Sequence, residues 1–161
     1  MTIKVALAGA GAFGIKHLDG IKNIDDVEVV SLVSRDLGKT REVADRYGIP
    51  HVSTELADSL AIDEVDAVIL CTPTQMHASQ SIACLEAGKH VQVEIPLCDV
   101  LAEGEKVVAL QKQTGLVAMC GHTRRFNPSH QFVHQKVQAG TFNIQQMDVQ
   151  TYFFRRSNMN A

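Results

Sequence analysis

A glycine-rich segment near the N-terminus has the residue types and spacing of a phosphate-binding turn. Gly9, Gly11 and Gly14 lie in the segment GAGAFG, directly after an apolar run. The first glycine of such a turn permits a sharp bend, the second lets a pyrophosphate approach the backbone, and the third lets helix and strand pack closely. The N–H groups that open the helix then face the phosphates. We therefore predict a dinucleotide site that also includes Ala12 and Phe13.

The residues about 20 positions beyond these glycines indicate which dinucleotide is bound. NAD sites place an Asp or Glu there, where the carboxylate binds the ribose 2′-hydroxyl. This chain has Ser34 at that position, followed by Arg35 and Asp36. A hydroxyl beside a guanidinium suits a 2′-phosphate, which a carboxylate would repel. We expect NADP rather than NAD, although a small shift of register would make Asp36 a ribose ligand and favour NAD.

Short apolar runs and longer amphipathic segments alternate along the chain. The strands that we predict are rich in Val, Ile, Leu and Ala, as is typical of strands buried on both faces: Ile3–Ala8, Val27–Ser34, Ala67–Leu70, His90–Val93 and Val117–Cys120. The predicted helices are Gly14–Lys22, Lys39–Tyr47, Met76–Ala87, Leu101–Thr114 and Ser129–Ala139. Four glycines follow helices closely and predict left-handed helix ends: Gly48, Gly88, Gly115 and Gly140. The alternation predicts an α/β fold with a Rossmann-type, doubly wound parallel sheet.

The length of 161 residues fits one domain and part of a second, since a domain has roughly 150 residues. We place a dinucleotide-binding domain at residues 1–122 and the start of a substrate and oligomerisation domain at residues 123–161. In the second part, Ile144–Arg156 is long enough for one extended strand, and no partner strand follows it. Because a lone strand is not stable, we expect either a truncated sequence or a partner from another chain. The alternative is a strand that pairs at the edge of the first sheet.

Charge and apolar patterning exclude several classes of function. The chain has 15 basic and 18 acidic residues, a formal net charge of −3 and no long Lys/Arg cluster, so we predict no nucleic-acid partner. No apolar run has the roughly 18 residues of a membrane span, and the N-terminus lacks signal-peptide features. We therefore predict a cytoplasmic protein without a membrane partner. No metal site is predicted, because His130 and His134 lie four apart on a helix without an obvious third ligand.

Three segments resemble the Gfo/Idh/MocA family of oxidoreductases: GAGAFG at 9–14, CTPTQMH at 71–77 and VEIP at 93–96. The resemblance covers the chain and corresponds to the N-terminal half of such enzymes. It implies a Rossmann domain followed by an open, mostly antiparallel sheet domain, and a homo-oligomer. Segments such as GHTRRFNPSHQ and QQMDVQTYFFRR are closer still to one member. That likeness implies NADP-dependent oxidation of the hemiacetal of a dicarboxylate semialdehyde to 2-pyrone-4,6-dicarboxylate, in protocatechuate degradation.

The resemblance also implies further cofactor contacts. The second segment supplies Cys71, Thr72, Pro73, Thr74 and His77, with the hydroxyls on ribose or phosphate and the imidazole near the nicotinamide ribose. The third segment supplies Glu94 and Pro96, and we expect a cis bond before this proline. Most members read Glu-Lys-Pro here, and the lysine helps to place the nicotinamide and relay a proton. Ile95 puts that relay in doubt but not hydride transfer, which is the chemistry of the cofactor.

A second group of residues suits a dicarboxylate substrate. Arg124 and Arg125 follow the last predicted strand of the sheet, and Thr123 and Asn127 flank them as further donors. Arginine binds carboxylates through paired hydrogen bonds, and open α/β sheets bind ligands beyond the carboxyl ends of their strands. We predict that these residues bind the substrate.

Oxidation of a hemiacetal needs a base for the hydroxyl proton, and His77 and His122 are the candidate catalytic residues in this chain. Members of the family usually take the base from the second domain, so we expect this chain alone to turn over little or no substrate. Two alternatives stay open. One is a family dehydrogenase for another sugar, polyol or aldehyde, which would not need paired guanidinium groups. The other is a non-catalytic dinucleotide-binding regulatory module, which the absence of lysine at Ile95 favours.

Overall fold

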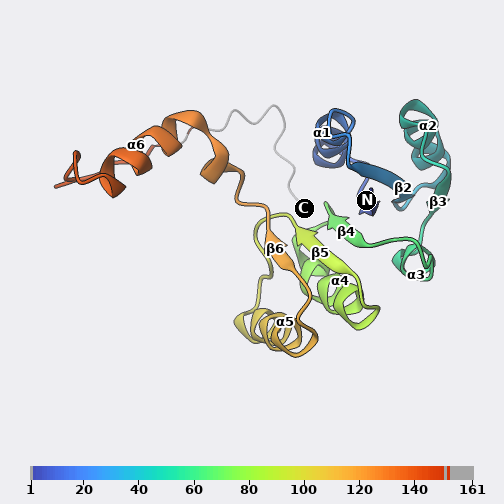
Figure 1. Cartoon of the computed structure of the whole chain (residues 1–161). Coiled ribbons are helices and arrows are strands. Elements are labelled where there is room, and N and C mark those ends of the chain that lie inside the picture. The colour runs from blue at the N-terminus through green and yellow to red at the C-terminus, as the bar shows by residue number, and fades with distance from the viewer. Residues whose placement is uncertain (1, 151, 153–161) are drawn as a thin grey trace. The chain divides into compact units, whose positions relative to one another are not determined.

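The computed structural model describes residues 2–150 and 152 of the chain, which divides into two compact units. Unit 1 comprises Met1–His122 and unit 2 comprises Thr123–Ala161 (Figure 1). Among the described residues, no helix has the length and apolar character that a bilayer crossing requires.

A six-stranded sheet forms the centre of unit 1, with the order β3-β2-β1-β4-β5-β6 and every pairing parallel. Its strands are β1 (Ile3–Ala8), β2 (Val27–Val33), β3 (His51–Ser53), β4 (Ala67–Leu70), β5 (His90–Val93) and β6 (Ala118–Cys120). The central strand β1 pairs with β2 on one side and with β4 on the other. The strand order therefore reverses at β1, which is the point where doubly wound sheets bind their ligands. The predicted Rossmann-type sheet is confirmed.

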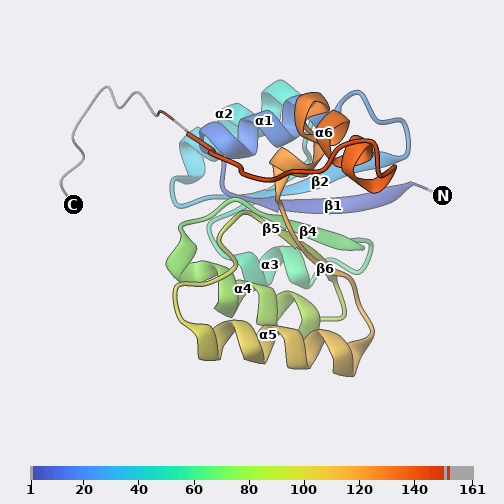
Figure 2. The same cartoon turned by 90° about the vertical axis from the view of Figure 1, so that its left-hand side faces the viewer.

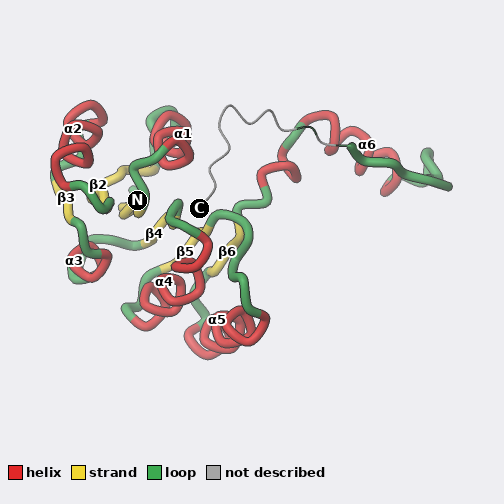
Figure 3. The backbone as a smooth tube through the Cα atoms, turned by 180° about the vertical axis from the view of Figure 1, so that it is seen from behind, coloured by secondary structure: helices red, strands yellow, loops and turns green. Residues whose placement is uncertain are grey.

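Helices cover both faces of this sheet (Figures 2 and 3). They are α1 (Ala12–Ile21), α2 (Leu37–Tyr47), α3 (Leu56–Leu60), α4 (Thr74–Glu86) and α5 (Leu101–Thr114). Successive residues of a strand point to opposite faces. Leu7 of β1 accordingly packs with Leu18 of α1 and Ala44 of α2, whereas Ala6 and Ala8 belong to a second core cluster under the other helices. This two-sided burial explains the continuous apolar runs of the sequence.

The predicted strands and helices of unit 1 all form, with ends that differ by three residues or fewer. The four glycines predicted at helix ends all have left-handed backbones, with φ between 68° and 74°. Two elements were missed, the strand β3 and the helix α3. Each is too short to show a hydrophobic period, and β3 is set by its pairing with β2 rather than by its own pattern.

Unit 2 begins with a short 3₁₀ helix, η1 (Thr123–Phe126), and continues with α6 (Pro128–Gln138). Asn127 caps α6 because its side chain accepts a hydrogen bond from the Ser129 N–H at 3.0 Å. The strand predicted over Ile144–Arg156 is wrong for residues 144–150 and 152, which form no strand. Residue 151 and residues 153–156 lie outside the described part of the chain. An extended segment becomes a strand only through ladder hydrogen bonds to a neighbour, and no described strand pairs with this one.

The glycine-rich turn joins β1 to α1 through two very close backbone contacts. A Cβ atom on Gly9, whose φ is +109°, would lie 2.4 Å from the Cys71 carbonyl oxygen. A Cβ atom on Gly14 would lie 1.8 Å from the Gly9 carbonyl oxygen. A Cβ atom on Gly11, in contrast, would meet nothing within 4 Å. Two of the three glycines are therefore required by packing, and the third leaves open space.

This difference predicts opposite stabilities for two alanine variants. Gly14→Ala must push the backbone apart, so its free energy of unfolding should fall by about 2 to 3 kcal/mol or more. Gly11→Ala should stay within about 1 kcal/mol of the unmodified chain, because only the helix N-cap preference changes. Urea unfolding followed by circular dichroism measures both values, and equal losses would contradict the packing account.

Candidate functional site

The start of α1 presents unpaired backbone donors beside the glycine-rich turn. The N-cap residue is Gly11, which has no side-chain capping bond. The turn itself is held in place, because the Gly9 N–H donates to the Val33 carbonyl at 2.7 Å. Gly11, Ala12 and Phe13 are exposed, and the Phe13 side chain is 62% exposed. A rigid turn with open N–H groups at a helix N-terminus can bind a pyrophosphate.

The end of β2 brings a hydroxyl and a cation to one side of this turn. Ser34 follows β2 directly, and its N–H donates to the Ser53 carbonyl at 3.1 Å. Arg35 is exposed and forms no salt bridge with any described residue. Asp36 is the N-cap of α2, where its carboxylate accepts a hydrogen bond from the Lys39 N–H at 3.1 Å. This bond holds the pKa of the Asp36 carboxyl below its usual range.

His77 does not have the geometry of a catalytic base. Its side chain is 2% exposed, and its two ring nitrogens lie 2.7 Å from the carbonyl oxygens of Pro96 and Thr72. Both carbonyls are acceptors, so both ring nitrogens are occupied as donors when both hydrogen bonds form. The imidazole therefore ties the segment after β4 to the segment after β5. These contacts are structural, and the catalytic role of His77 stays a prediction from the sequence.

The other residues after β4 are partly committed to internal contacts. The Thr72 hydroxyl donates to the Gln80 side chain at 2.5 Å, so it does not point freely toward a ligand. Pro73 is the N-cap of α4 and Thr74 is its first residue, and this helix start has no side-chain capping bond. The Cys71 N–H donates to the Ala8 carbonyl at 2.7 Å, which places the segment against the end of β1. These contacts hold the segment at the carboxyl edge of the sheet.

A histidine that the sequence analysis missed forms a pair with a predicted residue. His17 of α1 lies with its Nε2 atom 2.7 Å from Oε1 of Glu94, at the end of β5. The side chains are 22% and 14% exposed, respectively. His17 lies one helical turn after Gly14, and this spacing puts both residues on the same helix face. Because Gly14 faces the sheet, this spacing could have predicted from the sequence that His17 also lies near the sheet.

Cys71 completes a cluster with this pair. One ligand-type atom from each of His17, Cys71 and Glu94 lies within 4.8 Å of the others, and no other such group of three exists among the described residues. Burial, together with the negative charge of Glu94, raises the pKa of the Cys71 thiol to about 12. The thiol is therefore protonated near neutral pH. A zinc ion would have to displace that proton and the bond between His17 and Glu94 before it could bind here.

The segment after β5 confirms one expectation from the sequence. The peptide bond between Ile95 and Pro96 is cis, as predicted. The Ile95 side chain is 50% exposed and lies beside Glu94 in the chain. The segment after β5 therefore presents an apolar side chain, not a cation, at this position.

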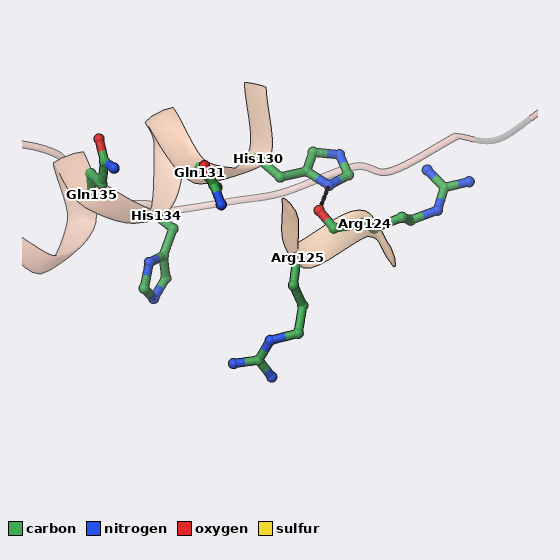
Figure 4. A pocket seen from close by; sticks show the side chains of 6 residues that line it. All are labelled: Arg124, Arg125, His130, Gln131, His134 and Gln135. Carbon is green, nitrogen blue, oxygen red and sulfur yellow. Dashed lines mark hydrogen bonds between the residues drawn. The ribbon is translucent and has the colours of Figure 1, made fainter. Parts of the chain in front are cut away.

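The residues predicted to bind a substrate all lie in unit 2, and the catalytic candidate His122 is the last residue of unit 1. A pocket of about 670 Å³ is lined by Arg124, Arg125, His130, Gln131, His134 and Gln135. The two guanidinium groups extend in different directions, and the Arg125 side chain points to the same side as His134 (Figure 4). His130 contacts the Arg124 carbonyl oxygen through Nδ1 at 3.1 Å. In this arrangement the two adjacent guanidinium groups do not point toward one common carboxylate position.

The remaining predicted residues are placed as follows. His122 is exposed, and its backbone N–H donates to the Cys120 carbonyl at 2.9 Å. Thr123 begins η1 and is exposed. Asn127 uses its side-chain oxygen to cap α6, so that oxygen already has a donor.

Comparison with known proteins gives a close relative. The chain is 66% identical, over 99% of its own length, to 4-carboxy-2-hydroxymuconate-6-semialdehyde dehydrogenase of Sphingobium sp. strain SYK-6, of which it covers 50%. It is 27% identical to the myo-inositol 2-dehydrogenase of Thermotoga maritima, over 86% of this chain and 42% of that protein. The chain thus spans about half the length of the curated relatives that it matches.

Solved structures share the same fold. Scyllo-inositol dehydrogenase of Lactobacillus casei, with bound NAD(H) and scyllo-inositol, superposes with a TM-score of 0.83 at 27% identity, over 87% of this chain and 42% of that one. A probable dehydrogenase of Thermotoga maritima has a TM-score of 0.84 at 27% identity, over 86% and 42%.

Two family models match separate parts of the chain. Residues 128–161 match the model described as the C-terminal part of bacterial oxidoreductases. Residues 3–122 match the model of the oxidoreductase family with an NAD-binding Rossmann fold. The second match covers the whole described sheet of unit 1 and the glycine-rich turn. The chain therefore belongs to the Gfo/Idh/MocA family of oxidoreductases.

Proposed function

We propose that this chain is the NADP-binding part of a dehydrogenase that oxidises the hemiacetal of 4-carboxy-2-hydroxymuconate-6-semialdehyde to 2-pyrone-4,6-dicarboxylate. The observation that carries the proposal is the 66% identity to the Sphingobium dehydrogenase over almost the entire chain. The open glycine-rich turn supports the proposal independently. It lies where the strand order of the sheet reverses, and such folds bind dinucleotides at that point.

The residues present fit the cofactor. Gly11, Ala12 and Phe13 would hold the pyrophosphate through backbone N–H groups, and Ser34 and Arg35 would hold the adenosine ribose with its 2′-phosphate. A cofactor held by these residues would supply the hydride-acceptor chemistry that oxidation of the hemiacetal carbon needs. The part of the protein would be to hold the ring in position. His77 supports this by fixing the segments after β4 and β5 to each other.

The preference for NADP over NAD is supported by the end of β2. Arg35 has no salt-bridge partner among the described residues, so its charge is available to a phosphate. Asp36 is engaged at the N-terminus of α2, which opposes its use as a ribose ligand. The inositol dehydrogenase of Lactobacillus casei binds NAD(H), so the family fold alone does not determine this preference.

Titration calorimetry of this chain with NADP+ and NAD+ tests the cofactor proposal. We expect tighter binding of NADP+, and Arg35→Ala should weaken NADP+ binding by about ten- to a hundredfold, the value of a charge-assisted contact. Binding of NAD+ should change by less than about threefold, because it lacks the phosphate. Arg46→Ala, an exposed arginine at the end of α2, is the matched control. Tighter binding of NAD+, or equal effects of both variants, would refute the assignment.

The substrate proposal rests on unit 2. Arg125 and His134 project to one side of the pocket, and this pair can bind a carboxylate through charge-assisted hydrogen bonds. Arg124 points elsewhere, so the first carboxylate is assigned to Arg125 and His134 without Arg124. His122 remains the candidate in this chain for accepting the hydroxyl proton, because its imidazole is exposed and His77 is committed to two carbonyls.

A chimera can test this assignment in an active enzyme. In it, this chain replaces the matching half of the Sphingobium relative, and oxidation of the semialdehyde is followed by NADPH absorbance. We expect activity, and Arg125→Ala should lower kcat/KM by about a hundredfold, whereas Arg124→Ala should lower it by less than about tenfold. The reverse order, or unchanged kinetics in both variants, would favour a dehydrogenase for an uncharged sugar or polyol.

A further inference from the structure

The strand order gives the two ends of the proposed dinucleotide site different surroundings. Ser34 and Arg35 end β2, on one side of the glycine-rich turn, where the adenosine ribose binds in this fold. The strands β4 and β5 lie on the other side of β1. A dinucleotide whose pyrophosphate lies on the turn must therefore extend its nicotinamide half toward the ends of β4 and β5.

Glu94 is the acidic side chain at that end of the site. It follows β5 directly, and its N–H donates to the Leu70 carbonyl at 3.0 Å, which fixes its backbone beside the end of β4. Its side chain is 14% exposed. Its negative charge contributes to the raised pKa of the Cys71 thiol, after the larger effect of burial. The carboxylate therefore acts on groups at the end of β4 through space.

No lysine or arginine neutralises this carboxylate among the described residues. Its one ion-pair partner there is His17, which carries a charge only when it is protonated. The next residue in the chain is Ile95, so the neighbouring side chain supplies no cation either. The proposed site thus has a cation, Arg35, at its β2 end and an anion, Glu94, at its β5 end.

We infer that the Glu94 carboxylate, held in place by His17, makes this chain bind the oxidised cofactor more tightly than the reduced one. This inference rests on the proposed NADP site. The nicotinamide ring carries one positive charge when oxidised and none after it has accepted a hydride. A fixed anion near the ring therefore stabilises the oxidised form selectively, while the phosphates contribute equally to both.

The size of the effect follows from Coulomb's law. A unit charge about 10 Å from the ring, at an effective dielectric constant of about 20, changes the ratio of the two dissociation constants by roughly tenfold. A charge far from the cleft is largely screened at ordinary salt concentration, since the Debye length is about 10 Å at 0.1 M. The ratio of the dissociation constants for NADP+ and NADPH therefore reports mainly on charges close to the nicotinamide ring.

His17 is a positioning residue in this account. Its ring nitrogen holds one carboxylate oxygen at 2.7 Å, and without it the Glu94 side chain is free to turn toward solvent. His17→Ala should therefore lower the preference for NADP+, and His17→Gln, which keeps a side-chain N–H donor, should retain most of it. A purely structural role of His17 would change both dissociation constants by the same factor.

The experiment compares dissociation constants for NADP+ and NADPH, measured by calorimetry and by nicotinamide fluorescence in one buffer. Glu94→Gln should reduce the preference for NADP+ by roughly tenfold, because the amide has the same shape without the charge. Glu105→Gln removes the same charge from an exposed position on α5 and should leave the ratio unchanged. Ile95→Lys is a second variant that keeps Glu94 and adds a cation at a half-exposed position, and it should reduce the preference similarly.

The outcomes separate this inference from the function on which it rests. If the folded, unmodified chain binds neither cofactor form, the NADP site and this inference both fail. If it binds both forms, but Glu94→Gln and Ile95→Lys leave the ratio unchanged, only the inference fails. A reduced ratio in both variants, with Glu105→Gln unaffected, supports it.

Discussion

The close approach of Gly14 to the Gly9 carbonyl is the contact on which the rest of the site depends. It lets α1 begin directly over the end of β1, so the unpaired N–H groups of the helix lie at the point where the strand order reverses. The same closeness brings His17, one helical turn further, to the end of β5. The two glycines Gly9 and Gly14 therefore set both the shape of the glycine-rich turn and the position of the pair formed by His17 and Glu94.

Around that contact, hydrogen bonds rather than apolar packing hold the edge of the sheet. His77 joins the segments after β4 and β5 through two carbonyl oxygens, and it is almost completely buried while doing so. Loops at such an edge have few apolar groups to bury, so directional bonds replace packing as the source of their fixed shape. These bonds fix the segments after β4 and β5 relative to each other.

The architecture of unit 1 could be predicted from the sequence because periodicity and composition reflect two-sided burial. The segment of β1 that contains Ala6, Leu7 and Ala8 is continuously apolar because these side chains are buried on both faces of the sheet. The glycine-rich turn was predictable because Gly9 and Gly14 each answer a local packing requirement. The two carbonyl contacts of His77 could not be predicted, since a motif gives a residue's position in the chain but not the groups that surround it. His17 was missed because its partner is 77 residues away. The strand at Ile144–Arg156 failed in its described part because strand formation depends on a neighbour.

In the proposed site, a dinucleotide lies across the point where the strand order reverses, with its phosphates on the start of α1. Backbone amide shifts of the isotopically labelled chain, recorded during titration with NADP+, are the measurement that can show this. We expect the largest changes at Gly11, Ala12 and Phe13, with further changes at Ser34 on one side and Glu94 on the other. Changes confined to unit 2, or to only one of these two sides, would contradict it.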